Sequence, residues 1–444
     1  MLKLCVLLPC VIMKNMKTTK AVIMAGGQGT RLGNLVREIP KPMVKVAGKA
    51  ILERQIESLK EFGIIDITIV VGYLGDIIKN YFKDGKDFGV NIDYISETSP
   101  LGSAGSLYFL KDKFNDDFVL LFGDLIESVN FEKMVQFHKQ KKALITLFSH
   151  PNSHPFDSDL IIADENDVVL GIDSKHNIRD YYYHNLVNAG IYVLSPKSLE
   201  FFNEIKKQDM EKDFIKSLIP TNCVFSYASS EYVKDAGTIE RLASVGNDIV
   251  NGVVKSKNTK HPQKAIFLDR DGTINVHKGH MSDINKFELV EDAAKAIKMI
   301  NESGYLAIVI TNQPVVARGE ISLEGLKEIH KKLETLLGKE GAYLDAIYFC
   351  PHYPESGFLG EVKELKIECE CRKPKIGLLL KAKERFNIDL TKSWFIGDSD
   401  LDIECGQNAE NKTILIKTFK ETLSKPDYVA ESLLDAVKIS LNVK

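Results

Sequence analysis

Short apolar runs alternate with amphipathic stretches in the first half of the chain. Between residues 20 and about 247, "AVIMAGG", "DITIVVG", "VNIDYIS" and "DFVLLFGD" have the length and composition of strands. "AILERQIESLKEFG" and "DIIKNYFK" instead carry apolar residues at helical spacing. "LITLFSH", "LIIADENDVVLGIDS" and "LVNAGIYVLSP" form a strand-rich insert. This alternation predicts a mostly parallel sheet between layers of helices.

A second series of the same kind begins at residue 264. "KAIFLDRDG", "YLAIVITNQ", "AIYFC", "SWFIGDS" and "TILIKT" read as strands, separated by helices such as "SLEGLKEIHKKLETLLG". Residues 251–263, "NGVVKSKNTKHPQ", are polar with little pattern and are interpreted as a linker. We therefore predict an α/β protein with two Rossmann-like three-layer units. The expected domains are an N-terminal extension (1–19), a first unit (20–250), the linker (251–263) and a second unit (264–444).

Composition agrees with a globular protein of two or three domains. The chain has 444 residues, 44% apolar and 27% charged, with a net charge of −3, so the basic excess of a nucleic-acid-binding protein is absent. Residues 2–13 are apolar apart from Lys3 but too few to span a bilayer, and no small-residue cleavage site follows. We interpret them as a disordered extension or as the product of an upstream start codon, with Met16 the natural start; a signal peptide is the alternative. We expect a cytoplasmic protein without membrane contact, whose oligomeric state is open. Reduced thiols are expected at four scattered cysteines: Cys5, Cys10, Cys223 and Cys405.

Acidic residues follow two strands of the second unit. Asp269 and Asp271 stand two apart at the end of an apolar strand, so their side chains point the same way. "FIGDSDLD" repeats the arrangement with Asp398, Asp400 and Asp402. Carboxylates that meet a phosphate at one sheet edge fit Mg²⁺, which offsets their repulsion.

Groups that suit a phosphoryl ligand lie between the two acidic motifs. Thr311 and Asn312 offer hydrogen bonds at the end of another strand, in "VITNQ". Arg372 and Lys373, in "CRKP", offer positive charge to phosphoryl oxygens. Nucleophile, acid–base group, phosphate clamp and metal ligands thus occur in one unit.

The motifs "DRDGT", "TNQ…ARG", "CRKP" and "GDSDLD" resemble the haloacid dehalogenase superfamily, in the branch that contains histidinol-phosphate phosphatase and D-glycero-D-manno-heptose 1,7-bisphosphate phosphatase. The resemblance covers about residues 264–440. It implies that Asp269 forms an aspartyl-phosphate and that Asp271 is the general acid and base. It implies Mg²⁺ ligands in Asp269, Asp398 and the Asp271 carbonyl, with Asp402 in support. The substrate residues that it implies are Thr311, Asn312, Arg318, Arg372 and Lys373. The chain has "TNQPVVARG" where the family more often has Ser-Gly-Ile after "TNQ", so the flap departs from the family pattern.

Three cysteines and a histidine gather in residues 350–371. Cys350 and His352 are two apart, as are Cys369 and Cys371, and sixteen residues separate the two pairs. Three thiolates and an imidazole make a closed tetrahedral set for structural Zn²⁺, whereas a catalytic Zn²⁺ would keep an open position. Buried free thiols are the alternative. The same branch of the superfamily carries such a zinc loop, which implies a role beside the substrate rather than at the catalytic centre.

A glycine-rich turn follows the first strand of the first unit. In "VIMAGGQGTRLG", Gly26, Gly27 and Gly29 allow backbone amides to approach phosphates, and Arg31 and Lys41 add positive charge. The turn is not a Walker A loop, because no Gly-Lys-Ser/Thr closes it, and it is a poor dinucleotide fingerprint. "AGGxGTRL" followed by "PKP" resembles the sugar-1-phosphate nucleotidyltransferases over about residues 20–245.

This resemblance implies a nucleotidyltransferase fold with a mixed sheet. The reaction would be an in-line attack of a sugar 1-phosphate on the α-phosphorus of an NTP, with charge neutralisation by Arg31 and Lys41. Asp124 and Asp235 would bind Mg²⁺. Contacts to the nucleotide or the sugar are implied for Gly26, Gly27, Gly29, Thr30, Gly102, Ser103, Gly105, Asn188 and Gly190. The usual Glu-Lys-Pro reads "DSKHN", so Lys175 is the best substitute for the second lysine; its alternative is an exposed charge on a hairpin.

Two enzymes on one chain favour consecutive steps. Both resemblances imply heptose activation, in which the 7-phosphate of D-glycero-D-manno-heptose 1,7-bisphosphate is removed and the 1-phosphate then receives a nucleotidyl group. GTP is favoured, because the first unit looks more like heptose and mannose guanylyltransferases. Two alternatives stay open: the same chemistries on another sugar phosphate, or an active phosphatase beside a degenerate nucleotide-sugar sensor.

Overall fold

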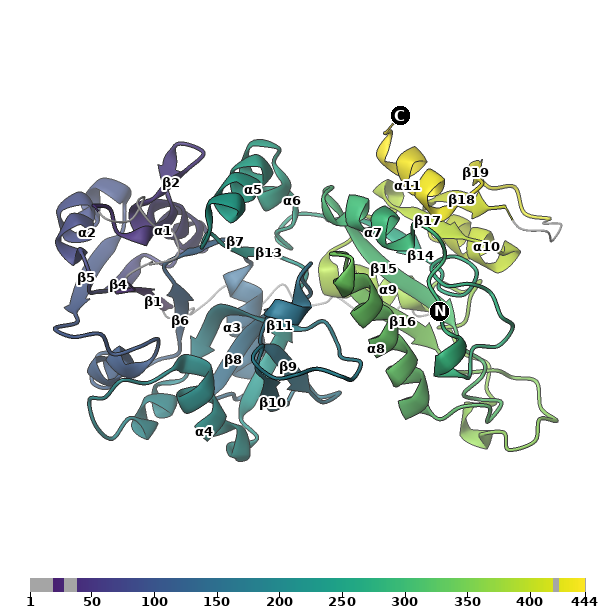
Figure 1. Cartoon of the computed structure of the whole chain (residues 1–444), viewed down its shortest axis with the longest axis horizontal. Coiled ribbons are helices and arrows are strands. Elements are labelled where there is room, and N and C mark those ends of the chain that lie inside the picture. The colour runs from purple at the N-terminus through teal and green to yellow at the C-terminus, as the bar shows by residue number, and fades with distance from the viewer. Residues whose placement is uncertain (1–18, 28–37, 418–422, 444) are drawn as a thin grey trace, which may run out of the picture.

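The computed structural model describes residues 19–27, 38–417 and 423–443. Their helices and strands form two α/β units that lie side by side (Figure 1). This confirms the predicted fold class. Among the described residues, no helix combines the length and apolar character needed to cross a membrane.

The first unit is built on a nine-stranded mixed sheet. Parallel pairing joins β1 to β4 and β6, whereas β11 runs antiparallel to β6 and β8. The path along the sheet is β10-β9-β11-β6-β1-β4-β5, and β8 and β12 lie off it. The strands are β1 (Lys20–Ala25), β4 (Asp66–Val71), β5 (Asn91–Ser96), β6 (Phe118–Phe122), β8 (Ile145–His150), β9 (Leu160–Ala163), β10 (Val169–Asp173), β11 (Val187–Leu194) and β12 (Val224–Ala228).

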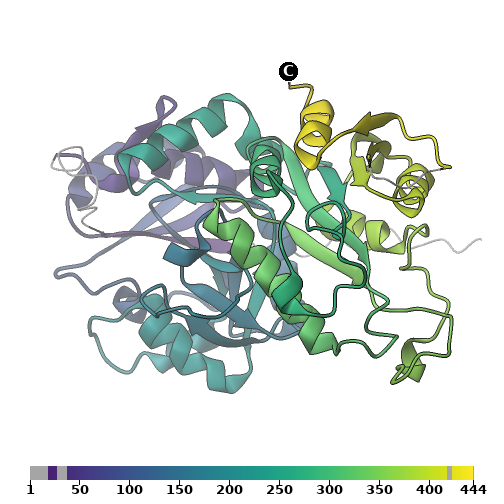
Figure 2. The same ribbon diagram turned by 45° about the vertical axis from the view of Figure 1, so that its right-hand side comes forward.

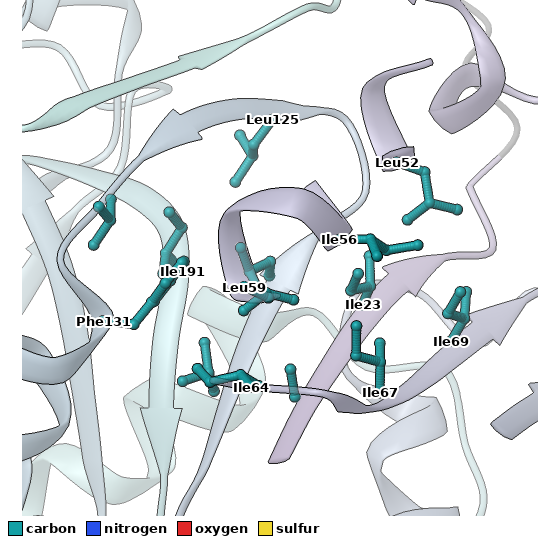
Figure 3. Close-up of a cluster of buried hydrophobic side chains, with 14 of the residues drawn as sticks. Ile23, Leu52, Ile56, Leu59, Ile64, Ile67, Ile69, Leu125, Phe131 and Ile191 are labelled. Carbon is teal, nitrogen blue, oxygen red and sulfur yellow. The ribbon is translucent and has the colours of Figure 1, made fainter. Parts of the chain in front are cut away.

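Alternate residues of the first sheet face two separate cores. Ile23 and Ile67 pack against Leu52, Ile56 and other apolar residues of α1 on one face (Figure 3), while Val22 joins the core on the other. The period of two along each strand therefore gives each face its own apolar layer. The helices of this unit are α1 (Ile51–Glu61), α2 (Gly75–Phe82), α3 (Phe131–Lys141), α4 (Lys216–Leu218) and α5 (Ile239–Val250). Two short ribbons complete it: β2 (Lys45–Val46) with β3 (Lys49–Ala50), and β7 (Leu125–Ser128) with β13 (Tyr232–Asp235).

The second unit has a six-stranded sheet in which every pair is parallel. The order is β16-β15-β14-β17-β18-β19, so the chain starts in the middle and winds to both sides. The strands are β14 (Lys264–Leu268), β15 (Tyr305–Asn312), β16 (Ala346–Cys350), β17 (Trp394–Gly397), β18 (Lys412–Ile416) and β19 (Tyr428–Ala430). Helices α7 (Ala293–Asn301), α8 (Leu323–Lys339) and α11 (Leu433–Leu441) cover one face. On the other face lie α9 (Gly377–Phe386) and α10 (Asp400–Asn408).

The segment between the units is packed rather than extended. Helices α5 (Ile239–Val250) and α6 (Val253–Ser256) lead into Lys257, Asn258 and Thr259, all buried. The Glu231 carboxylate accepts hydrogen bonds from the Thr259 amide (2.9 Å), the Thr259 hydroxyl (2.8 Å) and the Asn130 amide (2.9 Å). The polar composition of this segment, which has no periodic apolar residues, did not predict its burial, because the segment is held through hydrogen bonds. The two units are thus joined by an ordered segment of the chain.

Candidate active sites

Three carboxylates of the second unit converge at the carboxyl ends of its central strands. Asp269 follows β14, Asp398 follows β17 and Asp402 lies in the first turn of α10. One carboxylate oxygen from each lies within 4.8 Å of the others. Such oxygen donors fit Mg²⁺. Gly272 has a φ of +87°, and a Cβ there would lie 2.2 Å from an Asp398 oxygen, so only glycine lets the turn approach this carboxylate.

Lys373 fixes two of these carboxylates. Its ammonium group donates hydrogen bonds to Asp269 (2.7 Å), to Asp402 (2.5 Å) and to the carbonyl oxygen of Ile310 (2.9 Å). The lysine is buried, so its charge is compensated by the carboxylates rather than by water. Asp402 also accepts hydrogen bonds from the amide and hydroxyl of Ser399, which caps α10.

A separate set of side chains orients the second acid of the "DRD" motif. Asp271 accepts hydrogen bonds from the Arg270 guanidinium (2.8 Å), the Gln313 amide (2.7 Å) and the Asn275 amide (3.0 Å). Arg270 is fully buried and its other nitrogen lies 3.1 Å from His330 on α8. Asp271 is therefore held in one orientation beside Asp269.

These contacts separate the pKa values of the two aspartates. Burial raises the pKa of Asp269 to about 7, and Lys373 opposes this rise. Burial also disfavours ionisation of Asp271, but the Arg270 guanidinium and three side-chain hydrogen bonds outweigh it and lower the pKa of that carboxyl. Burial, with the nearby Asp402 charge, raises the pKa of Asp398 to about 6. Paired carboxyls with different pKa values are typical of acid–base sites. A bound cation would stabilise the ionised forms of Asp269, Asp398 and Asp402.

The other predicted phosphate ligands lie around Lys373. Thr311 is buried and its hydroxyl accepts a hydrogen bond from Gln313 (2.9 Å). Asn312 exchanges two hydrogen bonds with the backbone of Lys373, at 3.0 and 3.2 Å. Arg318 instead pairs with Glu320 at 2.7 Å, and its guanidinium lies over the Phe358 ring at 4.2 Å. Its predicted substrate contact would require a change of partner.

The predicted zinc ligands form a compact cluster. The sulfur atoms of Cys350, Cys369 and Cys371 and a ring nitrogen of His352 all lie within 4.8 Å of one another. This set of three thiols and one imidazole fits a structural Zn²⁺ site. Arg372 comes next in the chain and donates a hydrogen bond to the His352 carbonyl oxygen (3.2 Å), so the cluster helps to fix its direction.

In the first unit the two predicted metal ligands are each paired with a cation. Lys41 bonds to Asp124, and Arg241 bonds to Asp235. The Ala236 amide donates to the Asp124 carbonyl oxygen (2.9 Å), which brings the two acidic segments together. Burial acts to raise the pKa of Asp235, but Arg241 and Lys41 outweigh it and lower that pKa. The Asp235 carboxylate is therefore available to a cation at neutral pH.

A cavity of about 1160 Å³ opens beside these carboxylates. Residues predicted to face the sugar line it from two segments of the first unit: Lys175, which follows β10, and Asn188 and Gly190 on β11. Asn188 donates a hydrogen bond to Glu211 (2.8 Å), and Glu211 also lines the cavity. The far wall comes from the second unit, with Asn301, Tyr343 and Asp345 among its residues.

The glycine-rich loops of the first unit are partly described. Gly29, Thr30 and Arg31 lie outside the described residues. Gly27 is exposed, and a Cβ on Gly26 would lie 2.4 Å from a Glu97 oxygen. Gly102 and Gly105 pack against the carbonyl oxygens of residues 208 and 206, where a Cβ would come within 2.3 Å. Ser103 accepts a hydrogen bond from the Met210 amide (2.7 Å). Close backbone packing thus accounts for the two glycines of this loop, and its nucleotide contact stays a prediction.

Sequence reasoning missed the partners that hold the acids in place. Arg270 stands between the two aspartates of "DRD", and a buried arginine requires a carboxylate, so this motif did contain a signal. Gln313 completes "TNQ" beside two residues that were singled out. Arg241 and Glu211 belong to helical stretches, and no local pattern connects them with Asp235 or Asn188.

Comparison with known proteins assigns both units. A nucleotidyl transferase family model matches residues 20–251, more than half of the chain, and a HAD-hydrolase-like model matches residues 370–436. The D-glycero-β-D-manno-heptose-1,7-bisphosphate 7-phosphatase of Haemophilus ducreyi is 39% identical over 181 residues, which are 39% of this chain and 97% of that protein. The chain belongs to the nucleotidyl transferase family and, in its second unit, to the HAD phosphatases. It is therefore a bifunctional enzyme.

Further relatives align with the second, HAD phosphatase unit. The enzyme of the same name from Pasteurella multocida is 37% identical over 187 residues, or 41% of this chain and 99% of that protein. The enzyme from Escherichia coli K12 is 36% identical over 176 residues, or 38% and 90%. Among solved structures, HddC from Yersinia pseudotuberculosis complexed with GMP-PN covers 52% of this chain and 99% of its own, at 24% identity and a TM-score of 0.46.

Proposed function

We propose that the chain catalyses two consecutive steps of heptose activation. The second unit removes the 7-phosphate of D-glycero-D-manno-heptose 1,7-bisphosphate. The first unit then joins the heptose 1-phosphate to a nucleotide, with GTP the favoured donor, and releases pyrophosphate. The observation that carries this proposal is the 36–39% identity of the second unit to heptose-bisphosphate 7-phosphatases over nearly their whole length, on a chain that also has a nucleotidyltransferase unit.

The geometry of the second unit supports an aspartyl-phosphate mechanism. Asp269 attacks the phosphorus, and Asp271 donates a proton to the leaving O7 and then takes one from the water that cleaves the aspartyl-phosphate. Lys373 and Thr311 hold the phosphoryl oxygens. Asp269, Asp398 and the Asp271 carbonyl would hold Mg²⁺, with Asp402 in support, and the ion would supply neutralisation of the phosphoryl charge. The Cys350–Cys371 cluster would hold a structural Zn²⁺, so that Arg372 keeps its direction.

In the first unit, Asp124 and Asp235 would hold Mg²⁺, whose charge would neutralise the triphosphate. Lys41 and Arg31 are proposed to align the triphosphate, and Lys175, Asn188 and Gly190 to bind the sugar phosphate. This unit does little covalent chemistry, because the phosphate of the sugar is itself the nucleophile. We keep the predicted domain limits, 20–250 and 264–444, as part of the proposal.

Phosphorus NMR tests the order and the position of the two steps. With heptose 1,7-bisphosphate and no NTP, the 1-phosphate should accumulate. Added GTP should then convert it to GDP-heptose and pyrophosphate. Accumulation of the 7-phosphate would overturn the pathway, and transfer with ATP but not with GTP would overturn the choice of donor.

The Arg372→Ala variant should lower phosphatase activity on the bisphosphate more than on a simple phosphomonoester. If Arg372 binds the distal anomeric phosphate, its loss should lower kcat/KM for the bisphosphate by roughly ten- to a thousandfold. The same variant should act almost normally on a simple phosphomonoester. Equal losses on both substrates would show that Arg372 does not read the distal phosphate.

A further inference from the structure

One face of α8, on the phosphatase unit, lies against the nucleotidyltransferase unit (Figure 2). The Tyr183 amide donates a hydrogen bond to the Thr335 hydroxyl (3.0 Å), and His184 lies 2.7 Å from the Glu334 carboxylate. Gly338 faces Pro155 so closely that a Cβ would lie 2.6 Å from the proline ring. Three positions within five residues of one helix thus make three different kinds of contact with the other unit.

The segments that α8 contacts are tied to each other. The Arg179 guanidinium donates hydrogen bonds to the carbonyl oxygens of Pro155 (2.7 Å) and Ser158 (2.8 Å). Asn152 and Asn185 exchange two hydrogen bonds, at 2.7 and 3.1 Å. Residues 151–159 and 179–185 therefore behave as one layer, with α8 on its outer side.

The inner side of this layer lines the part of the cavity in which the sugar phosphate is proposed to bind. The Asp159 carboxylate accepts a hydrogen bond from the Lys175 amide (2.8 Å), and the Asn188 amide donates to the Asp159 carbonyl oxygen (3.3 Å). Asp159, Lys175 and Asn188 all line the cavity beside Asp124. A displacement of the layer would therefore move the residues proposed to hold the sugar phosphate, whereas Lys41, which is proposed to align the triphosphate, lies in a different segment, Lys41–Met43.

We propose that Thr335, Glu334 and Gly338 of the phosphatase unit are positioning residues for the sugar-phosphate acceptor of nucleotidyl transfer. The inference rests on the proposed function of the first unit. They act through residues 151–159 and 179–185 and touch neither substrate. The phosphatase unit is then a structural part of the nucleotidyltransferase acceptor site, in addition to its own chemistry.

The test compares variants of the full chain. Thr335→Val removes the hydroxyl at almost constant volume, and Thr335→Ser restores it. Gly338→Ala adds one methyl group against Pro155, although alanine is the better helix former, so a general loss of helix stability is not expected. Glu324→Gln, at an exposed position in the first turn of the same helix, is the control. Pyrophosphate release is measured with the heptose 1-phosphate varied and then with GTP varied. Phosphate release from the bisphosphate is measured in parallel.

Thr335→Val and Gly338→Ala should each raise KM for the sugar phosphate by about two- to tenfold, the size of one lost hydrogen bond or close contact. KM for GTP and the phosphatase rate should change by less than about twofold, and Thr335→Ser should behave like wild type. Hydrogen–deuterium exchange should speed up in residues 151–159 and 179–185. Unchanged KM for the sugar phosphate, or equal changes for both substrates, would overturn the inference.

The exchange measurement keeps the two proposals apart. If the wild type releases no pyrophosphate with any pair of NTP and sugar phosphate, the proposed function of the first unit fails. Exchange still decides the role of α8 in that case. Faster exchange confined to residues 151–159 and 179–185 supports the positioning, and unchanged exchange overturns it.

Discussion

At the scale of single residues, the two sites balance their acids differently. In the phosphatase unit one buried lysine, Lys373, contacts both Asp269 and Asp402. In the nucleotidyltransferase unit Asp124 and Asp235 each have a cation of their own, Lys41 and Arg241. Neutralising one acid therefore leaves the cation of the other site untouched, and the two activities should fail independently.

Asp269→Asn should lower phosphate release by about a thousandfold or more, because the nucleophile is lost. Pyrophosphate release should stay within about twofold of wild type. Asp124→Asn should have the reverse effect. Parallel phosphate and pyrophosphate assays on folded protein check this. If either variant loses both activities, the assignment of two separate sites is wrong.

Glu127 gives the fold a specific dependence on pH. Its carboxylate accepts a hydrogen bond from the Ser58 hydroxyl (2.8 Å), and burial raises its pKa to about 8. Between the unfolded pKa near 4.5 and this value, the folded state binds the proton that the unfolded state has released. The contribution of Glu127 to stability should therefore fall as the pH rises from about 5 to 8, by on the order of a few kcal/mol, and be level outside this range.

Glu127→Gln should remove this fall, because glutamine is neutral at every pH. The variant should melt at a higher temperature than wild type at pH 8.5 and show little advantage at pH 5. Calorimetry at both values measures the difference. Glu57→Gln makes the same chemical change at an exposed position of α1 and should shift neither melting temperature by more than about 1 °C. An equal gain at both pH values would mean that Glu127 is ionised in the fold.

At the scale of elements, sequence reasoning worked best where strands end. Strands of four to eight residues are recognised by their apolar runs, and the polar residues at or just after their ends meet at one sheet edge, as Asp269, Thr311 and Asp398 do. It worked least well where a contact joins distant segments. Arg241 contacts Asp235 from a helix, and no local pattern in the sequence shows that Thr335 of α8 contacts the other unit. The roles predicted for the site residues stay predictions.

The loop from Cys350 to Cys371 contains little regular secondary structure, and its order should depend on a bound metal ion. Elemental analysis of metal-washed protein should find about one Zn²⁺ per chain. Cys369→Ser should lose the ion and lower phosphatase activity without removing the nucleophile, since Arg372 is attached to the loop. Cys223→Ser, in the nucleotidyltransferase unit, should keep the ion. A zinc-free wild type with full activity would refute the structural metal.

At the scale of the whole molecule, the two units form a continuous structure. Buried Glu231 binds the connecting segment, and α8 contacts the layer formed by residues 151–159 and 179–185. A polar sequence between two domains usually indicates a flexible linker. Here the same composition supplies hydrogen bonds to buried groups, a use that depends on the partner's position and is therefore invisible in the sequence.

The two ends of the parallel sheet in the phosphatase unit lie at different sites: the carboxyl ends of the strands at the phosphatase site, and the amino ends at the nucleotidyltransferase cavity. Asp269 and Asp398 follow their strands, whereas Asn301, Tyr343 and Asp345, in the wall of the nucleotidyltransferase cavity, precede theirs. On the proposed function, heptose 1-phosphate would be made at one end of the sheet and used at the other, and we expect it to pass through bulk solvent. When the bisphosphate carries an isotopic label, a tenfold excess of unlabelled heptose 1-phosphate should dilute the label in the nucleotide sugar by about as much. Undiluted label would demand an enclosed route. The covalent link then serves to supply the two catalysts in equal numbers, a fixed ratio of capacities rather than a private path for the metabolite.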